Sequence, residues 1–158
     1  MEPVVDRKVF RDLSYGLYIV TARDGDRLNG QIINTAIQVT SDPPRVAVII
    51  NKKNLTHEFI DKSKVFAISV LDEEAPMTFI GLFGFRSGRD IDKLSKTQFR
   101  AGITQCTILT EHILSVLEAK VTDQIDLGSH TIFIGETVHS EVLREGRPMT
   151  YTYYHQTL

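Results

Sequence analysis

Short runs of β-branched and aromatic residues, separated by turn residues, follow one another along most of the chain. The first covers residues 17–23 and ends at the turn Asp24-Gly25-Asp26. The continuous apolar run of residues 46–50 follows Asp42-Pro43-Pro44 and is typical of a strand buried on both faces. The same reasoning predicts further strands over residues 31–40, 65–71, 117–122 and 130–138.

Three segments have the spacing of helices. In the first, Val5, Val9 and Leu13 recur every four residues, and Gly16 follows as a C-cap. The other two are predicted over residues 54–63, with Asn54 as the N-cap, and over residues 75–83. Strands outnumber helices, β and α segments do not alternate regularly, and no Gly-x-Gly-x-x-Gly turn is present. The pattern therefore predicts a mainly β fold with added helices, a β-barrel rather than a Rossmann fold.

Length and charge narrow the classes of function. With 158 residues we expect one domain, residues 1–158. The net charge is −2 with both signs scattered, so we expect no nucleic acid and no anionic membrane surface as partner. No apolar run approaches the ~20 residues of a membrane helix, and the N-terminus does not resemble a signal peptide. We therefore expect a cytoplasmic protein.

The single cysteine and the five histidines show little sign of metal or disulfide chemistry. Cys106 has no intrachain partner, and we interpret it as a small apolar residue on a strand rather than as a redox thiol. The histidines lack the spacing of metal ligands, so we expect no protein-bound metal.

Two stretches could bind a phosphate group. Residues 51–56, Asn51-Lys52-Lys53-Asn54-Leu55-Thr56, follow the buried strand and open a helix, whose first turn leaves backbone N–H groups unpaired. Residues 84–90 contain Arg86 and Ser87 as donors, between two glycines that permit close approach. The alternatives are a helix cap with solvated lysines and a polar surface loop.

A third stretch, residues 29–40, carries amides and hydroxyls where a barrel strand would normally carry Val and Ile. These side chains suit the imide edges of a flat heterocycle, and the alternative is a polar edge strand. His130 begins a later strand, where a lone histidine is commonly a surface or capping residue.

Taken in order, these motifs resemble the flavin reductase-like family. The matching stretches are residues 16–21, 29–31, 38–44, 51–56, 83–90 and 130–135. The tail Met149-Thr150-Tyr151-Thr152-Tyr153-Tyr154-His155 is similar to the branch of flavoredoxins and of the flavin domains of high-molecular-weight rubredoxins.

The resemblance implies an FMN-binding split β-barrel that acts as a homodimer and holds one FMN non-covalently. It implies that the flavin ring lies along Gln38, Val39 and Thr40, and it places His130 on the nicotinamide or substrate side as the candidate catalytic residue. Phosphate contacts are implied for Asn51, Lys53, Asn54, Thr56, Arg86 and Ser87. We add Asn34, Thr35, Lys52 and Tyr154 to the cofactor-binding candidates.

The predicted function is an oxidoreductase that takes a hydride from NAD(P)H, or electrons from a protein donor. The acceptor would be free flavin, a ferric chelate or a redox protein such as rubredoxin. Ser129 stands where the wider family often has Asp, which weakens the case for the usual NADH site. With one cysteine the chain holds no rubredoxin domain, so we expect electrons to leave to a separate protein or a small molecule. The alternatives are a non-catalytic split-barrel binding module and an oxidase of the pyridoxamine-phosphate type.

Overall fold

The computed structural model describes residues 1–157 and is built on a seven-stranded antiparallel sheet in the order β2-β1-β5-β8-β9-β4-β3. Its strands are β1 (Tyr18–Asp24), β2 (Arg27–Ile33), β3 (Ala36–Ser41), β4 (Pro44–Asn51), β5 (Val65–Leu71), β8 (Ile113–Asp126) and β9 (His130–Val142). A separate hairpin is formed by β6 (Phe99–Ala101) and β7 (Thr107–Leu109). The sheet curls, but its edge strands β2 and β3 are not hydrogen-bonded to each other. The expected mainly β fold with added helices is confirmed, in the form of a split barrel.

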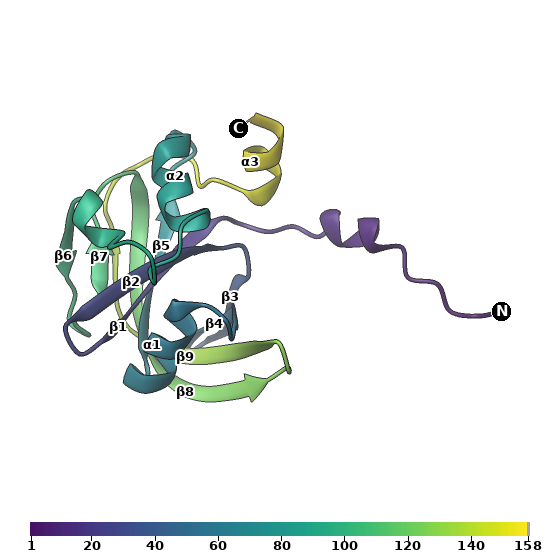
Figure 1. Cartoon of the computed structure of the whole chain (residues 1–158), viewed down its shortest axis with the longest axis horizontal. Coiled ribbons are helices and arrows are strands. Elements are labelled where there is room, and N and C mark those ends of the chain that lie inside the picture. Colours follow the sequence, from purple (N-terminus) through teal and green to yellow (C-terminus); the bar gives the residue numbers. More distant parts are fainter. Residues whose placement is uncertain (158) are drawn as a thin grey trace.

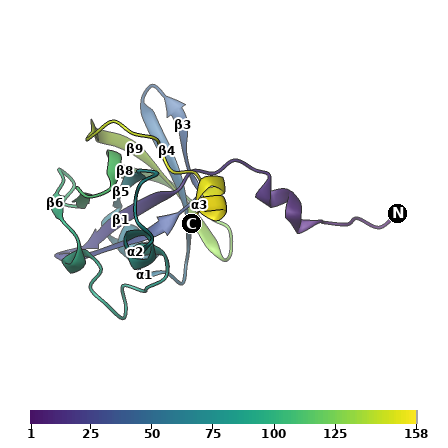
Figure 2. The ribbon, with the colours of Figure 1, turned by 90° about the horizontal axis from the view of Figure 1, so that it is seen from above.

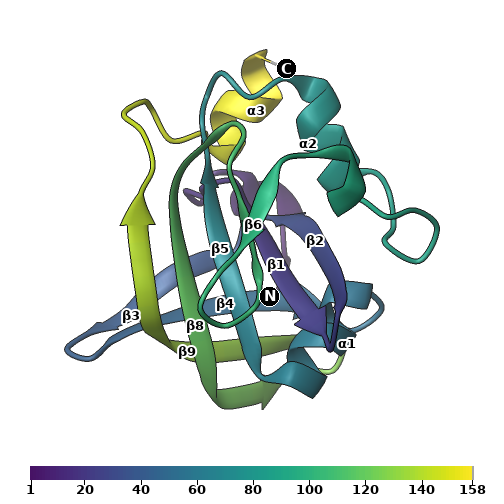
Figure 3. The same cartoon turned by 90° about the vertical axis from the view of Figure 1, so that its left-hand side faces the viewer.

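Helices cover the open ends of the curled sheet (Figure 1). Helix α1 (Leu55–Ser63) joins β4 to β5 and packs on β1, β2 and β4. Helix α2 (Met77–Gly84) and helix α3 (Tyr151–Thr157) lie at the other end, as Figure 3 shows. Two 3-10 turns complete the described secondary structure, η1 (Arg7–Arg11) and η2 (Leu94–Lys96). None of the helices within residues 1–157 has the length and apolar character needed to cross a membrane.

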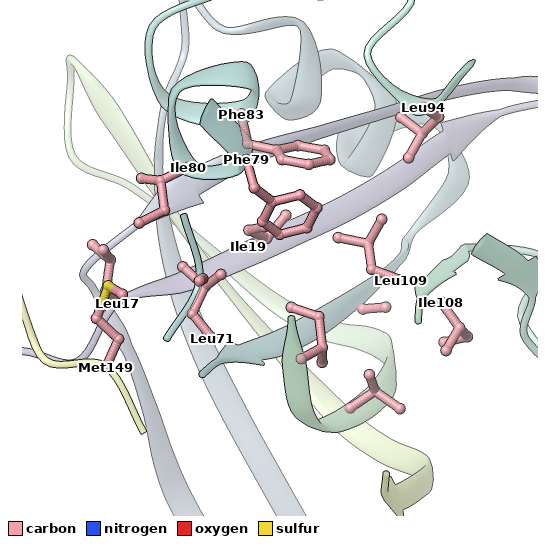
Figure 4. Packing of buried hydrophobic residues seen from close by; sticks show 14 of the residues in the cluster. Leu17, Ile19, Leu71, Phe79, Ile80, Phe83, Leu94, Ile108, Leu109 and Met149 are labelled. Carbon is pink, nitrogen blue, oxygen red and sulfur yellow. The ribbon is translucent and has the colours of Figure 1, made fainter. Parts of the chain in front are cut away.

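Strand β1 separates two hydrophobic clusters because successive side chains of a strand point to opposite faces. Ile19 packs in the first cluster with Phe79 and Phe83 of α2, as Figure 4 shows. Val20, the next residue, packs in the second cluster with Phe59 of α1. Both β1 side chains are fully buried. Helices α1 and α2 are therefore held on opposite faces of the same strand.

The predicted strand 31–40 is wrong as a single element. The structure divides it into β2 and β3, with a break at Asn34-Thr35. Strand β2 pairs with β1, whereas β3 pairs with β4 at the other edge of the sheet. The break lets the chain pass from one edge of the split barrel to the other.

The predicted N-terminal helix over residues 5–13 is also wrong in extent. Only a five-residue 3-10 turn forms, and it has no buried residue. This segment stands away from the rest of the chain in Figures 1 and 2. Its apolar side chains, those of Val5, Val9, Phe10 and Leu13, are exposed, so no packing within this chain extends the helix.

Cys106 is fully buried on the approach to β7. Burial raises the pKa of its thiol to about 11, which keeps it protonated and unreactive at neutral pH. The interpretation of Cys106 as a small buried residue is confirmed, but its placement on a strand is wrong, because Cys106 lies just before β7.

Candidate functional site

The two stretches predicted to bind phosphate line the same cavity, which has a volume of about 360 Å³. The turn before α1 supplies Lys53, Asn54 and Leu55, and the loop after α2 supplies residues 84–88. The remaining lining residues come from β2, from α2 and from the end of the second loop: Asn29, Gln31, Ile32, Phe83 and Lys93. Segments about thirty residues apart in the sequence thus meet at one cavity, which we call the cationic cavity.

The second loop reaches this cavity through a close contact with β2. A Cβ atom built on Gly88 would lie 2.1 Å from Oδ1 of Asn29, so only glycine permits this approach without a shift. Asn29 is itself buried, and its Nδ2 donates a hydrogen bond of 2.9 Å to Oγ1 of Thr56 in α1. Asn29 therefore supports both loops at once.

The charges that line the cationic cavity all have one sign. Lys53, Arg86 and Lys93 are present, and no Asp or Glu is among the described residues around it. Lys93 is only 3% exposed, and its ammonium donates to the backbone carbonyls of Gly30 at 2.9 Å and Phe83 at 3.1 Å. Burial lowers the pKa of Lys93 to about 8. This arrangement favours an anion in the cavity.

Arg89 connects the two loops instead of lining the cavity. Its guanidinium donates to Glu58 of α1 at 2.6 Å and to the carbonyl of Lys53 at 3.2 Å. The hydrogen bond from Arg89 holds the pKa of the Glu58 carboxyl below its ordinary value. The second loop is thereby tied to the first turn of α1.

The start of α1 presents donors to the same cavity. Asn54 is the N-cap, as predicted, with extended backbone and no capping hydrogen bond from its side chain. Oδ1 of Asn51 accepts a bond of 2.9 Å from the Lys53 N–H, which shapes the turn. Because the first turn of a helix leaves N–H groups unpaired and carries the positive end of the helix dipole, this end also favours an anion.

A second cavity of about 420 Å³ adjoins the first and shares Gln31, Ile32 and Asn54 with it. Its polar lining groups are amides, hydroxyls and one imidazole, from Gln31, Asn34, Thr35, Asn51, Asn54, Ser129 and His130. His130 pairs with Asn51 across β9 and β4, and its Nδ1 lies 2.7 Å from Oγ of Ser129. The second cavity is thus polar but carries no fixed charge from its described lining residues.

Gln31 carries a buried acceptor between these two cavities. Its Oε1 is buried and has no hydrogen-bond partner within residues 1–157. A buried polar atom left without a partner costs about 1–3 kcal/mol. A ligand that donates a hydrogen bond at this point would remove that cost.

A third cavity of about 490 Å³ continues from the second, with which it shares Asn34, Thr35 and Ile49. Its lining is mainly apolar, with the side chains of Ile37, Val39, Ala47, Ile49, Ile125, Ile132 and Ile134. From the apolar run of β4, Ala47 and Ile49 line this cavity; Ala47 is buried as predicted, whereas Ile49 is only half-buried. The three cavities form one continuous series that changes from cationic to polar to apolar.

Residues 10–158 match the flavin reductase like domain family. The chain belongs to this family. The resemblance found in its motifs is therefore confirmed over nearly its whole length.

Two relatives are similar to this flavin reductase-like chain over nearly its whole length, and their names describe different proteins. The high molecular weight rubredoxin of Moorella thermoacetica is 51% identical over 152 residues, which is 96% of this chain and 66% of that protein. The chain thus spans about two thirds of the length of the Moorella protein. The ferric-chelate reductase (NAD(P)H) of Archaeoglobus fulgidus is 44% identical over 151 residues, which is 96% of this chain and 89% of that protein.

Solved structures support the fold of this flavin reductase-like domain. Flavoredoxin from Methanosarcina acetivorans aligns with a TM-score of 0.80 at 19% identity, over 94% of this chain and 81% of that one. The Streptomyces globisporus C-1027 NADH:FAD oxidoreductase SgcE6 aligns with a TM-score of 0.82 at 23% identity, over 94% of this chain and 92% of that one. At these identities the likeness concerns the fold alone.

Most of the predicted site residues of this flavin reductase-like chain lie along the three cavities. Four line the cationic cavity: Lys53, Asn54, Arg86 and Ser87. Four line the polar one: Asn34, Thr35, Asn51 and His130. Val39 lines the apolar one.

The other predicted site residues lie elsewhere or act indirectly. Lys52 pairs with Asp126 at 2.6 Å, and Thr56 is fully buried beneath the cationic cavity. Gln38 is exposed and donates to the carbonyl of Thr40, whose own hydroxyl donates to Pro43. Tyr154, on α3, packs against the first hydrophobic cluster.

Sequence reasoning missed Asn29, Gln31 and Lys93 as individual site residues. Asn29 and Gln31 had a weak signal, since polar residues two apart on a strand share one face. Lys93 had none, because one more lysine in a charged loop gives no sign that it is buried.

Proposed function

We propose that this protein binds one FMN non-covalently along the three cavities, with the phosphate in the cationic cavity. The observation that carries the proposal is a cavity lined by three cations and no carboxylate among its described residues, joined through Gln31 to a polar cavity. Each of the three cavities, at about 360, 420 and 490 Å³, has the size of a small-molecule site. The single domain expected over residues 1–158 is part of this proposal.

The residues present fit the parts of such a cofactor. Lys53, Arg86 and the first turn of α1 would hold the phosphate by charge-assisted hydrogen bonds. Oε1 of Gln31 would accept from a hydroxyl of the sugar-alcohol chain or from the ring imide. The amide and hydroxyl of Asn34 and Thr35 would reach the edge of the ring, and the apolar cavity would receive its hydrocarbon end.

We further propose that the domain is a reductase that uses NAD(P)H or a protein electron donor. When bound, FMN supplies the redox chemistry, accepting a hydride and releasing electrons to an acceptor. The chain's own residues position it, and His130 faces the polar cavity, where a hydride donor or substrate would approach.

The names of the relatives suggest two classes of acceptor. One relative is named a ferric-chelate reductase and another a rubredoxin, so we propose a ferric chelate or a rubredoxin-type protein, and we keep free flavin as a third candidate. The choice among them, like the cytoplasmic location, stays a prediction.

We propose a homodimer as the working form. Exposed apolar side chains gather around the apolar cavity on β3 and β8, including Ile37, Val39 and Ile125. A symmetric contact through this face would cover them and close the apolar cavity over the ring. The exposed N-terminal segment, with Val9, Phe10 and Leu13, offers further apolar surface to a second copy.

Anaerobic reduction tests the proposed function. The purified protein is titrated with FMN and then with NADH or NADPH, and the flavin absorbance is followed. We expect a yellow complex that is bleached by one of the nucleotides and recovers when a ferric chelate is added. A yellow complex that neither nucleotide nor reduced rubredoxin bleaches would instead indicate a non-catalytic binding module.

A further inference from the structure

Lys93 is a buried cation with no counter-ion among residues 1–157. Its ammonium has three N–H donors, and two of them are bonded to the carbonyls of Gly30 and Phe83. The structure shows no acceptor for the third within residues 1–157, and no carboxylate pairs with this side chain. The Phe83 carbonyl belongs to the last turn of α2, where the helix dipole favours a positive charge.

The charged groups around Lys93 do not balance it. From the turn before α1 comes Lys53, and from its own loop comes Arg86, both of which line the same cavity. The carboxylates of Asp90 and Asp92 are exposed and line a neighbouring cavity instead. Glu58 of α1 is already paired with Arg89. Strand β2 contributes Asn29, Gln31 and Ile32 to the cavity lining, and none of them carries a charge.

We propose that the Lys93 ammonium faces the phosphate in the cationic cavity and so selects flavins that carry one. In alkaline solution, where the side chain of the free protein is neutral, Lys93 takes up a proton as the phosphate enters. The proton comes from the buffer and completes the ammonium, which then faces the anion. The inference rests on the proposed FMN site and adds that FMN binding there is coupled to proton uptake by Lys93.

The sign of the linkage follows from burial. Burial lowers the pKa of Lys93 from its ordinary 10.5 to about 8 in the free protein, so the neutral amine becomes the main form above that pH. A phosphate dianion beside it favours the charged form and moves the pKa upward again. Binding near and above pH 8 therefore takes up as much as one proton, and the Kd for FMN rises by as much as about tenfold per pH unit there. Below pH 8 the amine is already charged, and the Kd for FMN changes little with pH.

Calorimetry on the unaltered protein tests the linkage without relying on a variant. FMN and riboflavin are titrated at about pH 8.5 in two buffers that differ in ionisation enthalpy, which yields the number of protons taken up. We expect between about half a proton and one proton for FMN and none for riboflavin. Riboflavin has the same ring but no phosphate, so the proton uptake measured with riboflavin shows any contribution from ionisation of the ring.

Variants then assign the proton to Lys93. In Lys93→Met we expect FMN affinity to fall about tenfold or more at neutral pH, riboflavin affinity to stay, and proton uptake to vanish. Lys96→Met is the matched control, because this exposed lysine lies three residues further on, outside the cavity. It should retain both the affinity and the proton uptake.

The outcomes separate the inference from the proposed function. If the wild type binds neither FMN nor riboflavin, the proposed function fails and the inference fails with it. If FMN binds more tightly than riboflavin but without proton uptake, the site stands and the inference is overturned. Proton uptake that persists in a folded Lys93→Met protein would also overturn it, and would assign the proton to another group.

Discussion

The two ends of the candidate site differ in how completely one chain builds them. At the cationic end, three segments of the same chain meet, and Asn29, Arg89 and Lys93 connect them by hydrogen bonds. At the apolar end, Ile37 is 65% exposed and Ile125 is 46% exposed, although both line the cavity. For the proposed FMN complex we therefore expect phosphate recognition to be a property of the single chain and enclosure of the ring to depend on a second copy.

The largest expected effect is at the apolar end. Ile37→Lys places a charge in the proposed contact twice, once per protomer, and should weaken the dimer by about 2 kcal/mol or more, roughly thirtyfold. Because Ile37 is exposed in the single chain, the fold should survive. We expect sedimentation to show monomers, and FMN and riboflavin to be lost together.

Ile103→Lys is the matched control for this substitution. Ile103 is 62% exposed but lies in the β6–β7 hairpin, away from the apolar cavity. If both variants remain dimeric and bind flavin, the apolar end is not an interface. The proposed difference between the two ends of the site would then be wrong.

At the cationic end, Lys53→Ala and Arg86→Ala should act on the phosphate alone. Each should weaken FMN binding by about 1.5–3 kcal/mol, a loss of roughly tenfold or more, with little change for riboflavin. Added salt should weaken FMN binding to the wild type more than to the double variant. Fluorescence titration of both flavins measures these effects.

Lys52→Ala serves as the control for these variants, since the Lys52 amine pairs with Asp126 outside the cavity. An equal loss of FMN affinity in Lys52→Ala would mean that the lost positive charge acts at long range and not through direct contact with the phosphate. Equal weakening of FMN and riboflavin in the other two variants would point to a damaged fold.

A smaller effect is expected from Gly88→Ala, which tests how the loop after α2 is seated. The new methyl group would overlap the buried amide of Asn29. We expect the free energy of unfolding to fall by about 1–3 kcal/mol, measured by urea denaturation. Gly84→Ala is the comparison, because its Cβ would lie 3.3 Å from Ile32, a contact that a small shift relieves. A fully stable Gly88→Ala protein would show that the loop is not held against β2.

The smallest effect concerns the exposed pair of Arg89 and Glu58. Because the pKa of Glu58 is held below its ordinary value, the pair stabilises the fold above that value, and the contribution disappears as the pH falls through the lowered pKa. Arg89→Ala should therefore melt slightly below the wild type at about pH 7, and the difference should shrink as the pH falls below the ordinary titration range of a glutamate. A difference that grows in acid would contradict this assignment.

The cavities were predictable in part because some of their chemistry is local. The range 65–71 predicted for a strand is that of β5, and α1 begins directly after Asn54, since apolar runs and caps act over neighbouring residues. The two stretches predicted to bind phosphate stand out for the same reason, and the structure brings both to one cavity. Lys52 and Lys53 show the limit, because adjacent lysines look alike until Asp126, far along the chain, pairs with one of them.

Local patterns in this chain specified most strands of the large sheet, the start of α1, the cation-rich loops and the family to which the chain belongs. Packing between distant segments decided that residues 31–40 would divide at Asn34-Thr35, and that the two loops would meet over β2. Packing also decided that Lys93 would be buried and that the N-terminal segment would find no support within one chain. The physical reason is that backbone geometry and capping depend on neighbours in the sequence, whereas burial, and with it the pKa of a lysine, depends on which remote segments exclude water.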